Sequence, residues 1–373
     1  MKRRRKVALN GRFSGTLQPT GTQIVAFRLF DAIVRAPRDF DLEIFADPAY
    51  EGVGAWADIP NTRLEKVPFS QWARSKAQLW EQAVMPWAVR SRGCDLVHHP
   101  MMTCPRWSLG TPTVVTLHDL NFYHHPQWMD PKFRSWAMHT ALPGLRKADY
   151  VVAISDFVLE DMRRTFQLSP AKTCRIYNGS ESMAGAAVPP SSRQPATILG
   201  VNLWQPHKNL PRLLEAFALL RQEVPHAELH LAGRPQKNFK NSPDAARALE
   251  QPGVKLLGYL SREDLAKAYG EATVFCYPSL YEGFGLPVLE AMSAGTPVVT
   301  SNAASLPEVC GGAAVLVDPL SPADMARGLR EALLENESQR ASRITLGHKV
   351  AARFTWEEAA RQYISLFDRL LPA

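Results

Sequence analysis

The sequence predicts an α/β fold with two Rossmann-like domains. The chain has 373 residues, which is too long for one ordinary hydrophobic core and fits two domains. Strand-like apolar runs lead through polar or glycine-containing turns into helices, as in parallel α/β sheets. Residues 183–196 are rich in proline, serine and alanine and have no apolar period, so we predict that they link the domains.

The first predicted domain covers residues 1–182. Its predicted strands are 6–13, 41–46, 95–100, 111–120, 148–157 and 173–180, and its helices include 23–35 and 71–89. Ser155 is predicted to cap the helix that follows its strand. Asp39 and Asp41 form a D-x-D pattern, which can hold a divalent metal. They precede a strand, the wrong end for a ligand site in an open parallel sheet, so we do not assign a metal site there.

The second predicted domain covers residues 197–353, and residues 354–373 form a final amphipathic helix. Its predicted strands are 197–201, 227–234, 254–260, 273–279, 297–301 and 313–319. Asn209 is the predicted N-cap of the helix after the first of these strands. Lys208 precedes it, at a strand-to-helix crossing where a cation can meet a diphosphate.

A Gly-rich turn in the stretch 281–299 indicates an anion site. Gly283, Phe284 and Gly285 precede a helix that Pro287 opens and that is predicted to end near Gly295. The unpaired N–H groups of Gly285 and Leu286, together with the helix dipole, form a seat for phosphate.

Two glutamates, Glu282 and Glu290, flank this predicted phosphate seat. Like charges repel, so these carboxylates are poorly placed to hold the phosphate itself. They can accept hydrogen bonds from hydroxyl groups on either side of it. A nucleotide sugar, with a diphosphate between a hexose and a ribose, fits this arrangement. The alternative is an ordinary strand–helix unit whose glutamates are solvated.

The run EGFGLPVLEAMSAGTPVV, residues 282–299, resembles the signature of retaining nucleotide-sugar glycosyltransferases of family 4, which have the GT-B fold. The resemblance implies that Glu282 contacts the donor hexose and that Glu290 contacts the ribose. It implies that the two Rossmann-like domains face each other across a cleft and that the final helix, 354–373, crosses back onto the first domain. It also implies transfer with retention of configuration, with a mannosyl donor, GDP-mannose, as the narrower expectation. No cofactor and no metal are expected.

The same resemblance implies further donor-binding positions. A glycine before the first helix approaches the diphosphate, and Gly21 is the candidate. Lys208 is expected to neutralise the diphosphate, and the backbone around Tyr259 is expected to border the nucleobase. The family often has an arginine near this lysine, where this chain has His207 and Asn202. A missing or pH-dependent cation therefore weakens the expected neutralisation.

Histidine 118 is the second candidate catalytic residue, beside Glu282. It lies with Asp119 at the carboxyl end of a predicted strand, where ligands bind in parallel sheets. The resemblance places it next to the donor sugar and the leaving phosphate. The histidines at 98, 99, 118, 124 and 125 do not have metal-ligand spacing, so we do not assign a metal site to them.

Composition limits the partners. The net charge of +7 suits an anionic membrane or a phosphorylated acceptor, and equally a basic surface that is only solvated, but the sequence has no nucleic-acid-binding signature. Five cysteines without a C-x-x-C pair and no recognisable secretion signal predict a cytoplasmic protein with reduced thiols. The predicted helix with Trp72, Trp80 and Trp87 either packs on the core or contacts the inner face of the membrane.

The predicted function is therefore the transfer of a hexose, mannose favoured, to a saccharide or lipid-linked acceptor in polysaccharide biosynthesis. Two alternatives remain open. A sugar-nucleotide 2-epimerase shares the two-domain fold and converts the donor with no acceptor present. A non-catalytic nucleotide-sugar-binding module binds the donor without turnover.

Overall fold

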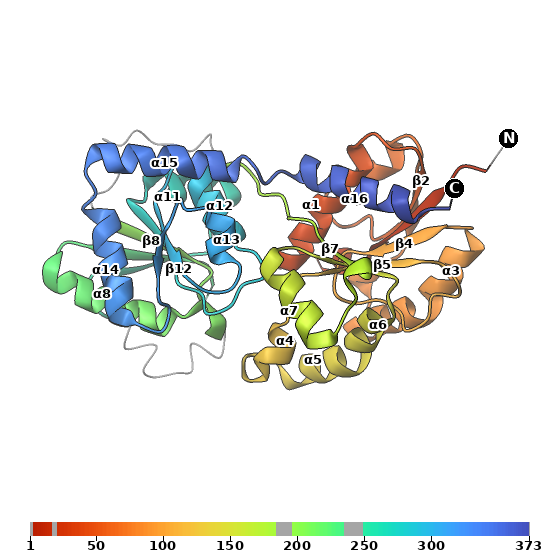
Figure 1. Cartoon of the computed structure of the whole chain (residues 1–373), viewed down its shortest axis with the longest axis horizontal. Helices are drawn as coiled ribbons and strands as arrows, with labels where there is room; N and C mark the ends of the chain where they lie inside the picture. The colour runs from red at the N-terminus through yellow and green to blue at the C-terminus, as the bar shows by residue number, and fades with distance from the viewer. Residues whose placement is uncertain (1–2, 17–20, 184–195, 235–248, 373) are drawn as a thin grey trace. The chain divides into compact units, whose positions relative to one another are not determined.

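The chain folds into two compact α/β units (Figure 1). Unit 1 comprises Met1–Gly179 together with Thr355–Ala373, and unit 2 comprises Ser180–Phe354. The computed structural model describes residues 3–16, 21–183, 196–234 and 249–372. Most of the predicted linker, residues 184–195, lies outside the described residues. Both units have a parallel sheet, as the alternation of strands and helices predicted.

Unit 1 contains a seven-stranded parallel sheet in the order β3-β2-β1-β4-β5-β6-β7. Strands β1, β2, β4, β5 and β6 are buried over most of their length, as expected for strands covered on both faces. The edge strand β3 was not predicted, because its sequence, TRLEK, is polar and its side chains are partly or fully exposed. The bounds of the strands are β1 Lys6–Gly11, β2 Asp41–Ala46, β3 Thr62–Lys66, β4 Leu96–His99, β5 Thr113–Leu117, β6 Tyr150–Ala153 and β7 Thr173–Arg175. The helices are α1 Gly21–Arg35, α2 Arg74–Leu79, α3 Met85–Ser91, α4 Asn121–His124, α5 Pro131–Trp136, α6 Leu142–Lys147, α7 Asp156–Phe166 and α16 Trp356–Leu370.

The last helix of the chain, α16, belongs to unit 1 and packs beside α1 (Figure 1). Its apolar face enters the same core as β1, β2 and β4. Tyr363 anchors it: its hydroxyl lies 2.7 Å from the Thr116 hydroxyl, which contacts His98 Nε2 at 2.9 Å. His98 is fully buried, and burial lowers its pKa well below the usual value, so it packs as a neutral ring.

The segment predicted as one helix with three tryptophans on one side is interrupted. Between α2 and α3, residues Trp80–Val84 form a π-helical turn. A π turn adds a residue to the turn, so side chains beyond it rotate away from the face set by those before it. Trp72 and Trp80 pack against Phe69 in the core, whereas Trp87 is 66% exposed. Packing on the core therefore holds for Trp72 and Trp80 but not for Trp87, and contact of this segment with a membrane stays a prediction.

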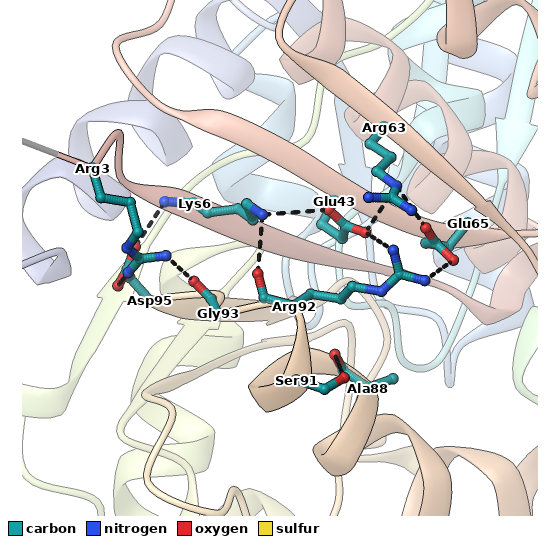
Figure 2. A network of polar contacts seen from close by, with 10 residues as sticks. All are labelled: Arg3, Lys6, Glu43, Arg63, Glu65, Ala88, Ser91, Arg92, Gly93 and Asp95. Carbon is teal, nitrogen blue, oxygen red and sulfur yellow. Dashed lines mark hydrogen bonds and ion pairs between the residues drawn. The ribbon is translucent and has the colours of Figure 1, made fainter. Parts of the chain in front are cut away.

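A network of ion pairs joins strands β1, β2 and β3 of the unit 1 sheet (Figure 2). Glu43 of β2 is buried, and three cations surround its carboxylate at 3.5–3.8 Å: Lys6, Arg63 and Arg92. Glu65 pairs more closely with two of them, at 2.8 Å to Arg63 and 2.6 Å to Arg92. Burial raises the pKa of Glu43, although the three cations oppose this shift.

Unit 2 contains a six-stranded parallel sheet in the order β10-β9-β8-β11-β12-β13. The strands are β8 Thr197–Val201, β9 Glu228–Ala232, β10 Val254–Gly258, β11 Val274–Tyr277, β12 Val298–Ser301 and β13 Val315–Val317. The helices are α8 Leu210–Glu223, α11 Arg262–Glu271, α12 Leu286–Ser293, α13 Leu306–Cys310, α14 Pro322–Leu333 and α15 Glu337–Ala351. Each strand begins or ends within a few residues of its predicted position. Helix α12 ends where predicted, because Gly295 takes the left-handed conformation (φ +75°) just beyond its C-cap.

Candidate functional site: an ion pair and a glycine loop at the switch point of unit 2

The strand order of unit 2 changes direction between β8 and β11. From β8 the chain adds β9 and β10 on one side, and β11 is followed by β12 and β13 on the other. In open parallel sheets, ligands bind at the carboxyl ends of the strands that flank such a switch point. Lys208 lies in the short 3-10 turn Pro206–Lys208 after β8, and Glu282 lies in the loop after β11. The topology therefore brings these two predicted donor-binding residues to one place.

Lys208 and Glu282 form a close, mostly buried ion pair. The distance from Lys208 Nζ to Glu282 Oε1 is 2.6 Å, and the side chains are 14% and 12% exposed. Lys208 also donates to the hydroxyl of Tyr277, at 2.5 Å. Burial works against both charges, but the attraction between them outweighs it, so the pKa of Lys208 is raised and that of Glu282 is lowered. Both groups are therefore charged at neutral pH.

Asn209 fixes the turn that carries Lys208. It takes the left-handed conformation (φ +64°), which asparagine tolerates better than most residues. Its side-chain amide donates to the carbonyl oxygens of Pro278 and Pro319, at 3.1 and 2.6 Å. Asn209 occupies the predicted N-cap position of α8, but its side chain does not cap that helix. Instead it ties the turn to the carboxyl edge of β11, beside the loop that bears Glu282.

The glycine loop before α12 has the geometry of an anion seat. Gly285 has φ +120°, a conformation for which glycine is the suitable residue, and it is the N-cap of the helix. Among the described residues, no hydrogen bond uses the backbone N–H of Gly285 or Leu286. The buried Ser305 hydroxyl donates to the carbonyl oxygens of Glu282 and Phe284, at 3.0 and 2.7 Å, which fixes the loop. These two N–H groups lie at the positive end of the helix dipole.

Glu290 lies one turn into α12 and has a different environment from Glu282. The buried hydroxyl of Tyr269 donates to Glu290 Oε2 at 2.9 Å. Burial raises the pKa of Glu290, the hydrogen bond from Tyr269 opposes the shift, and the charge of Glu181 adds to it. The two glutamates of the predicted signature therefore differ: Glu282 is held ionised by a lysine, and Glu290 is held by a phenol and takes up a proton more readily.

Histidine 118 and Gly21 belong to unit 1 and are described within that unit. His118 directly follows β5, as predicted, and its Nε2 lies 2.7 Å from the carbonyl oxygen of Pro100. Because a carbonyl only accepts, Nε2 carries a hydrogen, and burial lowers the pKa of the ring. A neutral imidazole of this tautomer offers Nδ1 as an acceptor, which suits a hydroxyl better than a phosphate oxygen. Helix α1 begins at Gly21, two residues earlier than predicted.

Tyr259 lies just beyond β10, at the same edge of the unit 2 sheet. Its side chain is 71% exposed, and the guanidinium carbon of Arg234 lies 5.1 Å from its ring centroid. His207 is nearly buried beside Lys208, and its charged form would lower the pKa of Glu282. Asn202 takes a left-handed conformation (φ +53°) after β8. These residues occupy the carboxyl edge where the sequence placed them, and their roles stay predictions.

Three residues of the site were not predicted: Tyr269, Tyr277 and Ser305. The hydroxyl of each forms a hydrogen bond with a predicted site residue: Tyr269 with Glu290, Tyr277 with Lys208, and Ser305 with the backbone of Glu282. Tyr277 sits in the apolar run of β11 and Tyr269 in α11, so in sequence both look like ordinary core aromatics. The one available signal was a phenol at the carboxyl end of a strand next to the glycine loop.

The described residues contain no group of three or more histidine, cysteine, aspartate or glutamate side chains that could hold a metal ion. The histidines that were considered as ligands have other partners. His99 contacts the Asn10 amide at 2.9 Å, and His124 contacts Asp161 at 2.8 Å. Asp39 and Asp41 pair with Arg5 and Arg4 at the amino end of β2.

The family of the chain follows from comparison with known proteins. Residues 19–181 match the model of the family "Glycosyltransferase Family 4", and residues 187–345 match "Glycosyl transferases group 1". The O-antigen chain mannosyltransferase B of Escherichia coli is 31% identical over 307 residues, which are 76% of this chain and 77% of that protein. The chain belongs to the family 4 glycosyltransferases.

Two further comparisons extend this assignment. The serotype-specific mannosyltransferase WbdA of E. coli is 29% identical over 69% of this chain, and the chain spans about a third (34%) of its length. The crystal structure of Alr3699/HepE from Anabaena in complex with UDP and glucose covers 98% of this chain and all of that one (100%). Its TM-score is 0.69 at 18% identity. Together with the two parallel-sheet units, this likeness identifies the GT-B fold of this glycosyltransferase.

Proposed function

We propose that this glycosyltransferase moves a hexose, mannose favoured, from a nucleotide-diphosphate sugar to a saccharide or lipid-linked acceptor in polysaccharide biosynthesis, with retention of configuration. The observation that carries the proposal is the Lys208–Glu282 pair at the switch point, next to the N–H groups of Gly285 and Leu286. A cation and a helix N-terminus together neutralise a diphosphate. The name of the E. coli relative supports mannose and a polysaccharide product.

Each site residue has its own role in the transfer reaction. As the glycosidic bond breaks, charge grows on the leaving diphosphate, and Lys208 with the start of α12 stabilises it without a metal. Glu282 accepts hydrogen bonds from the hexose hydroxyls, and Glu290 accepts them from the ribose. His118 contributes an acceptor nitrogen to a sugar hydroxyl. Gly21 and Tyr259 contact the diphosphate and the nucleobase.

The test combines binding and turnover. We expect GDP-mannose to raise the melting temperature more than UDP-glucose does, because a ligand that binds only the folded state stabilises it. With an oligosaccharide acceptor, the product should carry mannose with the anomeric configuration of the donor, by NMR. Conversion of the donor to its 2-epimer without an acceptor would instead identify an epimerase. Binding with neither reaction would identify a binding module.

We further propose that unit 1 contacts a membrane surface through an apolar stripe on the α2–α3 segment. The stripe consists of Leu79, Val84 and Trp87, which are 66%, 48% and 66% exposed, and of Trp107, which is 62% exposed. The Trp107 indole donates to the carbonyl of Gln82 in the same segment, at 2.9 Å. Exposed aromatic and aliphatic side chains of this size favour the boundary between headgroups and acyl chains.

The charges around the stripe match an anionic surface. Exposed basic side chains occur in the same segment and next to Trp107 in the sequence, namely Arg74, Lys76, Arg90 and Arg106. Glu81, the acid in residues 74–91, is buried. The basic N-terminal run is a weaker candidate, because Arg3, Arg4 and Arg5 already pair with aspartates. Among the described residues, no helix combines the length and the apolar character needed to cross a bilayer.

Vesicle binding tests this part of the proposal. The protein should sediment with vesicles of 30% phosphatidylglycerol and less with neutral phosphatidylcholine, and added salt should weaken the binding. The double change Trp87→Ser and Leu79→Ser should release most of it. Leu334→Ser is the matched control, since Leu334 is equally exposed (66%) but lies in unit 2. Equal binding by both variants would rule out the stripe as the contact.

A further inference from the structure

Two buried tyrosines form hydrogen bonds with two charged residues of the candidate donor site, Glu290 and Lys208. Tyr269 is fully buried and donates to Glu290 Oε2 at 2.9 Å. Tyr277 is 2% exposed and accepts from Lys208 at 2.5 Å. Their rings both contact Phe275: its centroid is 5.3 Å from that of Tyr269 and 5.9 Å from that of Tyr277. Each phenol therefore projects from a packed aromatic core toward a different charged group.

The position of the Tyr269 hydroxyl is fixed by its surroundings. The ring packs edge-on against Phe275, with an interplanar angle of 69°. The Thr296 hydroxyl donates to the carbonyl oxygen of Tyr269 at 2.5 Å, which ties the end of α11 to the loop after α12. A buried aromatic side chain has few accessible rotamers, so its hydroxyl is a rigid reference point.

The Glu290 carboxylate, in contrast, depends on that hydroxyl for its orientation. A glutamate side chain has three rotatable bonds, and its carboxylate loses that freedom only where a partner holds it. Among the described residues, Tyr269 is the one hydrogen-bond donor to this carboxylate, and it uses Oε2. No hydrogen bond in the described chain uses Oε1. The second contact of this residue, from the Ser293 hydroxyl at 2.8 Å, reaches its backbone carbonyl instead.

We propose that Tyr269 is a positioning residue that turns Oε1 of Glu290 toward the ribose hydroxyls of the nucleotide and so sets the preference for ribose over deoxyribose. This inference rests on the proposed function, in which Glu290 receives the ribose. A carboxylate with one oxygen held by a phenol keeps the lone pairs of the other for vicinal hydroxyls. Binding energy is gained when the acceptor is already oriented before the ligand arrives.

The charges near Glu290 make this role visible in the pH dependence of binding. Burial and the carboxylate of Glu181 raise the pKa of Glu290, while the Tyr269 hydrogen bond and the charge of Arg262 lower it. Glu181 and Arg262 are themselves an ion pair, at 2.5 Å. Protonation of Glu290 removes an acceptor, so nucleotide affinity falls as the pH drops through its pKa. Loss of the Tyr269 hydroxyl raises this pKa further. The fall in nucleotide affinity at acidic pH, called here the acidic limb, then begins at a higher pH.

The experiment measures dissociation constants of GDP and 2′-deoxy-GDP by calorimetry between pH 4.5 and 8, for wild type, Y269F, Y277F and E290Q. The wild-type protein should prefer GDP about tenfold, the effect of one good hydrogen bond to a charged group. Y269F should lose most of this preference and shift its acidic limb upward. Y277F should keep the preference for GDP, because the hydroxyl that it removes contacts Lys208 and not Glu290. E290Q should lose both the preference and the acidic limb.

The outcomes separate this inference from the proposed function. If Y269F keeps both the ribose preference and the wild-type acidic limb, Tyr269 does not position Glu290. If the wild-type protein binds neither GDP nor UDP, the proposed function itself is wrong. Should Y269F fail to fold, E181Q replaces it: removing the Glu181 charge should move the acidic limb to lower pH. An unmoved limb in E181Q would then overturn the inference, since Glu290 would not be the titrating group.

Discussion

Arg12 and Glu81 form an ion pair in unit 1 at a place that corresponds to the Lys208–Glu282 pair of unit 2. Arg12 follows β1, its Nε lies 3.1 Å from Glu81 Oε2, and the two side chains are 13% and 1% exposed. The sheet order of unit 1 changes direction between β1 and β4, so this pair also lies at a switch point. Each unit thus holds one buried cation–glutamate pair beside the edge where parallel sheets bind ligands.

Glu81 and Glu43 provide a matched test of what buried carboxylates contribute to stability. Although burial raises its pKa, the charge of Arg12 and the contacts with His99 and Thr103 outweigh this and lower the pKa of Glu81 to about 2. Its contribution is therefore present above its unfolded pKa and is lost as the pH falls toward 2. E81Q should destabilise unit 1 by about 3 kcal/mol at pH 7, because Arg12 is left unpaired.

Glu43 should behave in the opposite way. The pKa of Glu43 is raised in the folded state, so folding favours the protonated carboxyl group over the ionised one. E43Q resembles the protonated side chain and should cost at most about 0.5 kcal/mol at pH 7. Urea unfolding followed by circular dichroism at pH 7 and pH 4 measures both variants. Similar losses in the two would contradict the opposite pKa shifts.

Breaking the Lys208–Glu282 pair should separate stability from donor binding. K208M alone leaves Glu282 ionised without its partner and should destabilise unit 2 by about 3 kcal/mol. The double variant K208M/E282Q leaves no unpaired charge and should recover most of that stability. Nucleotide-sugar affinity should fall at least about 100-fold in both variants, since the diphosphate loses its cation. Thermal unfolding and calorimetry measure the two quantities, and restored binding in the double variant would exclude Lys208 from the donor site.

His118 should act as a neutral acceptor, and its substitution should show this. Its Nε2 hydrogen is used by Pro100, and its pKa is lowered, so it stays uncharged through neutral pH. We expect H118F to lower kcat about 10- to 100-fold, because a hydroxyl of the sugar loses one partner. The pH profiles of kcat for the wild type and H118F should have the same shape, with no inflection near pH 6.5 that is present in the wild type and absent from H118F. Such an inflection would mean that the imidazolium takes part.

How much the sequence could predict depended on whether a residue acts through local or distant contacts. The glycine loop and all strands except the polar edge strand β3 follow from local patterns. The switch point does not, because it depends on the order of the strands in the sheet, which brings Lys208 and Glu282 together. The π turn at Trp80–Val84 could not be read, because its residues fit an α-helix equally well. Tyr269 and Tyr277 were missed for a related reason: an aromatic residue in a buried run predicts packing, and only the fold places its hydroxyl against a charge.

Chelation tests whether the transferase reaction needs a metal. In our proposal Lys208 and the N-terminus of α12 stabilise the leaving diphosphate, and these groups do not depend on a divalent ion. Turnover in 5 mM EDTA should therefore stay within about twofold of the untreated rate. A parallel assay with added Mg²⁺ or Mn²⁺ gives the comparison. If chelation abolishes activity and either ion restores it, a metal ion also stabilises the leaving diphosphate, a role that we assign to Lys208.

Gly285→Ala tests the anion seat through the backbone conformation of the glycine loop. Gly285 has φ +120°, which an alanine does not adopt without strain, and an added Cβ would lie 2.8 Å from Leu306 Cδ2. The loop should therefore shift and turn the N–H groups of residues 285 and 286 away from the diphosphate. Gly312→Ala is the control: it also has positive φ (+82°), but a Cβ there would meet no atom within 4 Å. We expect both variants to lose about 1–2 kcal/mol of stability. G285A alone should also weaken nucleotide-sugar binding, by calorimetry, and equal affinities in the two variants would remove the loop from the site.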